Sequence, residues 1–252
     1  MLALENKVTL ITGGNSGIGR ATAIMAAKEG AKVVIANRTA ESGQRVVQEI
    51  KDAGGEAMFV QADVAKAVQV KAMVETIVDR HGRLDCAFNN AGIAGVLAIA
   101  HEVKEEDWDE CIDINLKSVW LCMKYEIAQM LEQGGGSIVN QGSAAGLVAL
   151  PGALAYCAAK FGVIGLTKTA AIEYVKSNIR INAMCPSFVG TPLTQKLGED
   201  YPEFVEKAFP FQPNGRLGTP DEIASGVIWM LSDASSFANG LIMSVDGGYV
   251  AQ

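Results

Sequence analysis

The sequence predicts an α/β fold, a doubly wound seven-stranded parallel sheet with helices on both faces. Short runs of β-branched and apolar residues alternate along the chain with longer runs in which apolar residues recur every three or four positions. A glycine-rich turn also separates the first apolar run from the first helical one. The 252 residues contain no repeat, low-complexity tract or linker, so one domain spanning residues 1–252 is expected.

The order of the elements follows from these runs. Strands are expected at 8–12, 32–36, 57–61, 84–88, 137–141, 179–184 and 241–245. Helices are expected at 17–29, 41–53, 67–81, 106–132, 154–175 and 221–232. The segment 186–219 has five prolines and no clear period, and a connection of that length predicts a substrate lid over about residues 187–219.

Composition limits the partners that the chain can have. The formal net charge is -7, and no run of Lys or Arg could follow a phosphate backbone, which argues against nucleic acid and anionic membranes as partners. Charged residues within the first 14 positions argue against a signal peptide, and five cysteines without a C-x-x-C pattern fit reduced thiols, so we expect a cytoplasmic protein. His81 and His101 lack ligand spacing, and no metal site is expected.

The first glycine turn, "TGGNSGIG" at 12–19, lies between a predicted strand and a predicted helix. Glycines at such a turn allow the backbone to approach a pyrophosphate, whose charge is then stabilised by the helix N-terminus. The spacing is G-x-x-x-G-x-G, a partial match to the common dinucleotide fingerprint. The residues assigned to the cofactor here are Gly13, Asn15, Ser16, Gly17, Ile18 and Gly19.

The end of the second strand bears on the choice of cofactor. An Asp or Glu at this point would accept the ribose 2′-hydroxyl of NAD, but the sequence reads "ANRT". Asn37 carries no repulsive charge, and the planar guanidinium of Arg38 suits a 2′-phosphate, so NADP(H) is expected, with NAD(H) as the alternative. Arg38 could instead be a solvated surface residue. After the third strand, Asp63 and its neighbour Val64 face the adenine, or Asp63 caps the next helix.

The stretch "YCAAK" at 156–160 places Tyr156 and Lys160 on one face of a helix, about 5 to 6 Å apart at Cβ. A phenol with an ordinary pKa of about 10 moves protons poorly at neutral pH, and a nearby ammonium is expected to lower that pKa. Ser143 lies 13 residues upstream, where its hydroxyl could bond a substrate oxygen beside Tyr156. Cys157 projects from a different helix face and is interpreted as a packing residue.

These motifs together resemble the short-chain dehydrogenase/reductase family over essentially the whole chain. "TGGNSGIG" is similar to the family's T-G-x-x-x-G-x-G, "NNAG" at 89–92 to its motif after the fourth strand, and "YCAAK" to its Y-x-x-x-K. The resemblance implies a single-domain Rossmann fold. It also implies a catalytic tetrad, which is completed in this sequence by Ser143 and Asn115.

The resemblance implies a role for each member of the tetrad. Tyr156 would be the general acid in ketone reduction and the general base in alcohol oxidation. Lys160 would lower the pKa of Tyr156 and hold the nicotinamide ribose, Ser143 would orient the carbonyl, and Asn115 would hold a water of a proton relay. Further positions that the resemblance places beside the cofactor are Asn89, Ala91, Gly92, Pro186, Val189 and Thr191. One departure is Ser187, which stands where the family usually has a glycine.

The substrate follows from positions that line the cleft in similar proteins. None of them is charged here: Ala94, Gly95, Val96, Ala145, Leu147, Leu150, Pro151 and Phe188. A small or medium-sized, largely apolar ketone or secondary alcohol is therefore expected. The lid adds an apolar set that closes over the substrate, or packs against the domain or a neighbouring subunit: Leu193, Leu197, Phe204, Phe209 and Phe211.

Three alternatives stay open. The chain could be a 3-oxoacyl-(acyl-carrier-protein) reductase, although the site mouth offers few basic residues for an acidic carrier. It could be an NAD-dependent alcohol or sugar dehydrogenase, or a nucleotide sensor without turnover. The resemblance also implies a homotetramer with the helices at 106–132 and 154–175 paired between subunits.

Overall fold

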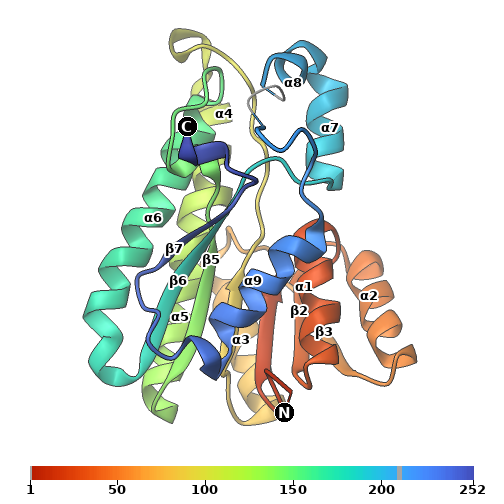
Figure 1. Cartoon of the computed structure of the whole chain (residues 1–252). Helices are drawn as coiled ribbons and strands as arrows, with labels where there is room; N and C mark the ends of the chain where they lie inside the picture. The colour runs from red at the N-terminus through yellow and green to blue at the C-terminus, as the bar shows by residue number, and fades with distance from the viewer. Residues whose placement is uncertain (1, 209–211) are drawn as a thin grey trace.

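The predicted parallel sheet forms the centre of the molecule (Figure 1). The computed structural model describes residues 2–208 and 212–252. Within these residues, seven strands pair in parallel in the order β3-β2-β1-β4-β5-β6-β7. The strands are β1 (Val8–Thr12), β2 (Lys32–Asn37), β3 (Glu56–Gln61), β4 (Cys86–Asn89), β5 (Gly136–Gln141), β6 (Ile179–Pro186) and β7 (Ile242–Val245). The strand order reverses between β1 and β4, and a crevice opens at this point at the carboxyl ends of the strands.

Helices cover both faces of the sheet, as the doubly wound fold requires. One face packs against α1 (Gly17–Lys28), α2 (Ala40–Asp52) and α9 (Pro220–Leu231), and α1 lies along α9 (Figure 1). The other face packs against α3 (Ala67–His81), α5 (Ser118–Gln133) and α6 (Leu154–Tyr174). None of the helices in the described ranges is long and apolar enough to cross a membrane.

The helix predicted at 106–132 is interrupted, which corrects the sequence prediction. The structure has α4 (Glu105–Ile112), a π-helical turn at Asp113–Lys117 and then α5. In a π-helical turn the backbone hydrogen bonds join residues five apart, one more than in an α-helix, and such turns often occur at functional sites. Here it contains Asn115, whose buried side chain contacts Cys111 on α4 and Ile93 in the loop after β4.

The segment predicted to lack a period contains two short helices, α7 (Pro192–Asp200) and α8 (Pro202–Ala208). Proline stands at the first position of each, where its missing N–H costs nothing. At the base of the segment, Gly190 N donates to Gly218 O and Gly218 N donates to Phe188 O, both at 2.9 Å. The segment therefore leaves and re-enters the domain at a single paired point, above the carboxyl ends of the strands (Figure 1).

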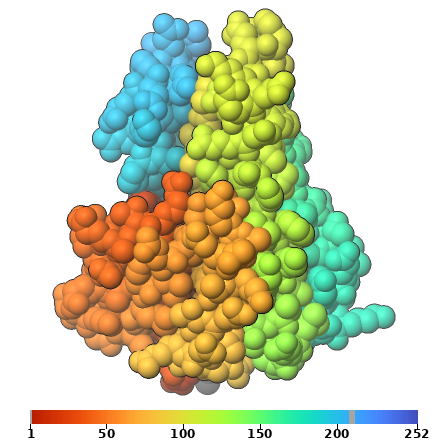
Figure 2. All heavy atoms as spheres, turned by 180° about the vertical axis from the view of Figure 1, so that it is seen from behind, coloured from red at the N-terminus to blue at the C-terminus, as the bar shows by residue number. Residues whose placement is uncertain are grey.

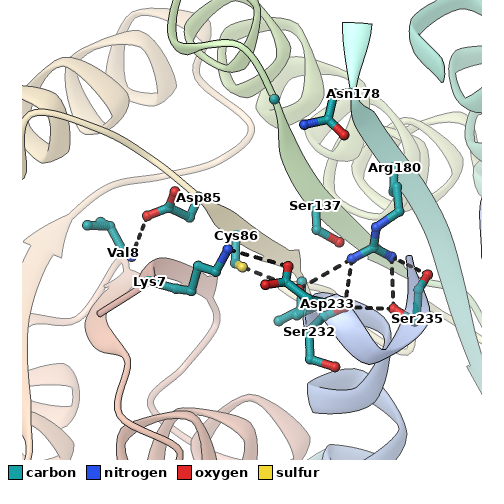
Figure 3. A network of polar contacts seen from close by, with 12 residues as sticks. Lys7, Val8, Asp85, Cys86, Ser137, Asn178, Arg180, Ser232, Asp233 and Ser235 are labelled. Atoms are coloured by element: carbon teal, nitrogen blue, oxygen red, sulfur yellow. Dashed lines mark hydrogen bonds and ion pairs between the residues drawn. The ribbon is translucent and has the colours of Figure 1, made fainter. Parts of the chain in front are cut away.

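The amino edge of the sheet, opposite the crevice, is held by a half-buried arginine (Figure 3). Arg180, at the start of β6, donates to the backbone oxygens of Met230 at 2.9 Å, Ser232 at 2.9 Å and Ser235 at 3.1 Å. Carbonyls at the end of a helix lack intrahelical partners, so this guanidinium completes the C-terminus of α9. The contact fixes α9 to the sheet far from the site.

Candidate active site

The walls of the crevice come from the residues that follow β1 and β4. The side-chain Nδ2 of Asn90 donates to the carbonyl oxygens of Thr12 at 3.0 Å and Gly13 at 3.3 Å. Thr12 Oγ1 in turn accepts from the backbone N–H groups of Asn90 and Ala91. The two loops at the topological switch point are thus joined directly.

Glycine is required at several positions of the first loop. Gly13 and Gly17 have φ of 65° and 52°, a region that side chains rarely adopt. A Cβ at Gly19 would stand 2.3 Å from the Gly13 carbonyl oxygen. The loop therefore folds tightly over the start of α1, with the geometry that a pyrophosphate needs.

A cavity of about 360 Å³ runs from this loop to the catalytic residues. The cofactor residues predicted from sequence that line it are Gly13, Asn15, Ser16, Gly17, Ile18, Asn37, Arg38, Asp63, Val64, Ala91, Gly92, Tyr156, Lys160, Pro186, Val189 and Thr191. Asn37 Oδ1 is buried and has no hydrogen-bond partner among the described residues. An unpaired acceptor and a glycine cradle at one end of a long cavity fit a dinucleotide.

Arg38 and Asp63 stand where the sequence placed them. Arg38 is exposed, and its guanidinium has neither a hydrogen bond nor an ion pair within residues 2–208 and 212–252. It is therefore available to a ligand in the cavity. Asp63 Oδ1 accepts from Ala65 N at 3.0 Å, so this carboxylate closes a turn while also lining the cavity.

Two of the predicted cofactor residues do not line the cavity. Gly19 packs against the Gly13 backbone and supports the loop from below. Asn89 is buried in the core, and its side chain bonds Glu126 and Asn140. The adjacent Asn90, which the sequence analysis did not single out, borders the cavity instead.

The catalytic residues come together from three elements. Ser143 follows β5 and accepts from Ala145 N at 3.1 Å, while Tyr156 and Lys160 occupy successive turns of α6. Lys160 Nζ lies 5.5 Å from the centre of the Tyr156 ring and donates to Gln141 O at 2.8 Å. The Ser143 hydroxyl stands near Tyr156 and favours its ionised form.

The electrostatics of this group correct one expectation. Burial raises the pKa of Tyr156 to about 12, and the Ser143 hydroxyl opposes the shift only in part. Burial also lowers the pKa of Lys160 to about 8. Desolvation of the phenolate is therefore the largest influence on this pKa, and the predicted lowering of the Tyr156 pKa is not found.

Asn115 joins the group through the π-turn. Its Oδ1 accepts from Ile93 N at 3.0 Å, and its Nδ2 lies 3.3 Å from Cys111 Sγ. A Cβ at Gly92 would come within 2.7 Å of Asn115 Oδ1. Glycine at position 92 thus allows the loop after β4 to rest on Asn115.

The far end of the cavity is apolar. Of the eight predicted substrate positions, Ala94, Ala145, Leu150 and Phe188 line it, whereas Val96 is exposed outside it. Gly95, Leu147 and Pro151 also lie outside the lining. The lid contributes Leu193, Leu197 and Phe204, and Phe209 and Phe211 are outside the described residues.

Figure 2 shows the surface of the molecule from behind. The blue projection formed by α7 and α8 stands beside the yellow projection near residues 95–110, and a furrow separates the two.

Sequence reasoning missed a contribution from the C-terminus. Tyr249 lines the cavity, and its ring packs edge-on against Phe188 with centroids 6.1 Å apart. Ser187, which departs from the family pattern, donates from Oγ to Asp246 O at 2.9 Å. Among the described non-glycine residues, positive φ occurs at Asn6 and Asn178, so Ser187 keeps an ordinary backbone conformation. The loop beside Phe188 therefore tolerates serine.

Known proteins match this chain along almost its whole length. A family model described as enoyl-(acyl carrier protein) reductase matches residues 13–250. Cyclohexanol dehydrogenase of Acinetobacter sp. (strain SE19) is 44% identical, over 98% of this chain and 96% of that protein. The 3-oxoacyl-(acyl-carrier-protein) reductase of Thermotoga maritima is 41% identical, over 99% and 100%.

A solved structure provides a further comparison. A protein of Beutenbergia cavernae, assigned as an NAD(P)-dependent gluconate 5-dehydrogenase and holding NADP at low occupancy, superposes with a TM-score of 0.92. It shares 34% sequence identity, and the match covers 100% of this chain and 99% of that one. Fold and length therefore agree along the whole chain.

Proposed function

Because the chain belongs to the short-chain dehydrogenase/reductase family, we propose that it is an NADP(H)-dependent oxidoreductase acting on a small or medium-sized, uncharged and largely apolar ketone and its secondary alcohol. The observation that carries the proposal is one cavity with three parts. It has a glycine cradle at one end, an apolar wall at the other, and the pair of Tyr156 and Ser143 between them. This arrangement fits hydride transfer to a carbonyl carbon with proton transfer to its oxygen.

The chemistry at the carbonyl oxygen belongs to the chain's own side chains. The bound dinucleotide supplies or accepts the hydride. Tyr156 Oη gives a proton to the oxygen during reduction and takes it back during oxidation, while Ser143 Oγ donates a hydrogen bond that stabilises the developing negative charge. The raised pKa of Tyr156 keeps its hydroxyl protonated at neutral pH, so the free protein is prepared to act as a proton donor.

Lys160 and Asn115 support the proton transfer. The hydrogen bond to Gln141 O fixes the Lys160 ammonium below Tyr156, where it stabilises the phenolate left after proton donation. Asn115, held by the π-turn beside the loop after β4, is proposed to hold a water that links Lys160 to solvent, a route by which a proton from solvent replaces the one that Tyr156 gives up.

Two observations support NADP(H). The Arg38 guanidinium is exposed at the cradle end of the cavity and is unpaired in the described residues, which suits a 2′-phosphate. The Beutenbergia cavernae structure, similar over its whole length, holds NADP. NAD(H) is the competing choice.

The apolar wall supports the substrate class. Leu150, Phe188, Tyr249 and Leu193 enclose the end of the cavity beyond Tyr156, and none of them offers a charge to a carboxylate or phosphate. The similarity to a cyclohexanol dehydrogenase points the same way. A cyclic ketone or secondary alcohol with few polar groups is therefore the substrate class of choice.

A second candidate is 3-oxoacyl thioester reduction, which the similarity to the Thermotoga maritima reductase favours. The formal net charge of -7 disfavours docking of an acidic carrier. Comparing the rate on an acetoacetyl thioester with the rate on cyclohexanone separates the two candidates.

The chain is further proposed to be a cytoplasmic homotetramer that pairs through α5 and α6. These helices expose Trp120, Phe161 and Ile172, large apolar side chains that a partner subunit would cover. Phe161→Lys should give smaller species in light scattering, and an unchanged tetramer would reject this interface.

The function is tested by following oxidation of NADPH and of NADH with a panel of uncharged cyclic and linear ketones. The proposal expects faster turnover with NADPH and with cyclohexanone-like ketones than with thioesters or sugars. Faster turnover with NADH would overturn the cofactor assignment, and preference for thioesters would overturn the substrate class.

A further inference from the structure

A carboxyl group is buried in the core beneath the site, and the mechanism above does not use it. Glu126, on α5, has no solvent exposure, and its Oε2 accepts a hydrogen bond of 2.9 Å from Asn89 Nδ2. Its other oxygen, Oε1, is buried without a hydrogen-bond partner among the described residues, and so is Asn89 Oδ1. A carboxylate needs several donors, so a lone donor indicates that the neutral acid occupies this position.

Glu126 ends a chain of polar side chains that crosses the core. Asn89 Nδ2 also donates to Asn140 Oδ1 at 3.1 Å, and Asn140 Nδ2 donates to Thr167 Oγ1 at 3.0 Å. Thr167 Oγ1 then donates to Val163 O within α6 at 2.8 Å. The chain therefore links α5 with the ends of β4 and β5 and with α6.

Both strand ends in this chain lie next to the active site. Asn89 directly precedes Asn90, whose side chain holds the carbonyls of Thr12 and Gly13 in the cofactor loop. Asn140 directly precedes Gln141, whose carbonyl accepts the Lys160 hydrogen bond. A displacement of Asn89 and Asn140 would therefore move the residues that hold both the cofactor loop and Lys160.

The surroundings of Glu126 offer no compensating charge in the described part of the chain. Cys122, one turn earlier on α5, is the titratable neighbour, and its own pKa is raised by burial and by Glu126. The polar groups nearby are the amides of Asn89 and Asn140, from β4 and β5, and the hydroxyl of Thr167, from α6. Helix α3 and strand β6 contribute apolar side chains to the same core: Val70, Met73, Val74, Ile77, Ile179 and Ile181. Burial raises the pKa of Glu126 to about 7, and the bond from Asn89 opposes this shift.

We propose that Glu126 is a positioning residue whose neutral carboxyl keeps Asn89 and Asn140 seated between β4 and β5. Its ionisation in mildly alkaline solution displaces this pair and weakens dinucleotide binding at the glycine loop. The inference rests on the family's use of NAD(P)(H) and not on the proposed substrate.

The sign of the stability effect follows from linkage. The folded pKa is raised above the ordinary value of 4.5, so the folded chain keeps a proton that the unfolded chain has lost. Stability of the parent therefore falls as pH rises from 4.5 to about 7 and levels above that. Glu126→Gln removes this titration and closely preserves the shape of the side chain.

The test compares the parent, Glu126→Gln and the control Glu132→Gln, which alters an exposed carboxylate on the same helix. Thermal unfolding across pH 5 to 8.5 should show the difference between Glu126→Gln and the parent growing up to about pH 7 and then levelling. Glu132→Gln should follow the parent. If the stability difference between Glu126→Gln and the parent does not change with pH, Glu126 does not keep a proton in the folded protein and the proposal is wrong.

Cofactor binding supplies the second readout. Between pH 6 and 8.5, the Kd for NADPH or NADH, whichever binds more tightly, should rise about fivefold more in the parent than in Glu126→Gln. Equal changes in both proteins would overturn the coupling.

If Glu126→Gln fails to fold, infrared spectra of the parent still report whether the Glu126 carboxyl is protonated. A buried carboxylic acid band is expected at pH 6 and should be lost by pH 8.5, and absence of the band at pH 6 overturns the proposal. Unfolding and infrared measurements need no substrate, so a failed activity panel leaves this result intact.

Discussion

The Lys160 ammonium is tied to the last residue of β5, because its Nζ donates a 2.8 Å hydrogen bond to the Gln141 carbonyl oxygen. The same Nζ stands 5.5 Å from the centre of the Tyr156 ring. A buried ammonium with a single described bond is costly, and burial lowers its pKa to about 8. The position of this charge thus lowers stability, and its proposed role is to support proton transfer at Tyr156.

Lys160→Met should lower turnover by about 100-fold or more because the phenolate loses its cation. At pH 7 the variant should be more stable than the parent by about 1 to 3 kcal/mol, since the parent holds a buried charge. Because the pKa of Lys160 in the folded protein is lowered from 10.5 to about 8, the loss of stability that its buried charge causes is complete below pH 8. This loss shrinks as pH rises toward 10.5, since the folded protein then holds a neutral amine. Thermal unfolding at pH 7 and pH 10 measures the difference in stability between Lys160→Met and the parent. A parent that is the more stable protein at pH 7 would contradict the expectation.

Arg38→Ala should weaken NADPH binding by about 10- to 100-fold, the effect of losing a charge-assisted pair, and should leave NADH binding nearly unchanged. Arg45→Ala is the matched control, because Arg45 is exposed on α2 and lies outside the cavity lining. Fluorescence titration gives both constants. Equal losses for the two cofactors would mean that Arg38 does not contact a 2′-phosphate.

Gly19→Ala should abolish measurable dinucleotide binding, because its Cβ would stand 2.3 Å from the Gly13 carbonyl oxygen and the loop must shift. Gly165→Ala is the control, since a Cβ at this helical position of α6 meets nothing within 4 Å. The control should bind cofactor normally and gain about 0.5 to 1 kcal/mol of stability. Unaltered binding by Gly19→Ala would show that the loop is not held as described.

Arg180→Met should destabilise the fold by about 2 to 4 kcal/mol, because the carbonyls at the end of α9 lose their donor in a half-buried place (Figure 3). Arg20→Ala, which removes an exposed pair with Glu49, should cost less than about 1 kcal/mol. Urea unfolding monitored by circular dichroism compares the two. Similar small losses would show that Arg180 contributes little to holding α9.

Much of the fold could be predicted from sequence because its signals are local. Each predicted strand overlaps an observed one, since a strand buried on both faces must be a short, nearly continuous apolar run. The run "VTLIT" is β1 without change. The glycine loop was predicted for the same reason, because tight backbone approach at Gly13 and Gly17 leaves a direct trace in the residue type.

The remaining features depend on contacts between distant residues. The π-turn around Asn115 has no signal in a sequence whose helical period runs through it. The burial of Asn89 follows from its partner Glu126, 37 positions away. Tyr249 reaches the cavity only because β7 returns beside β6. The raised pKa of Tyr156 likewise follows from desolvation by the surrounding residues, which spacing on a helix does not reveal.

Tyr156 is proposed to transfer the proton to and from the carbonyl oxygen, and Tyr156→Phe removes the hydroxyl that would do so. The variant and the parent are assayed for ketone reduction with the preferred cofactor, and cofactor binding is measured for both. Turnover should fall by at least about 100-fold, the contribution of a positioned general acid, while the cofactor Kd should stay essentially unchanged. Turnover by Tyr156→Phe close to that of the parent would contradict it.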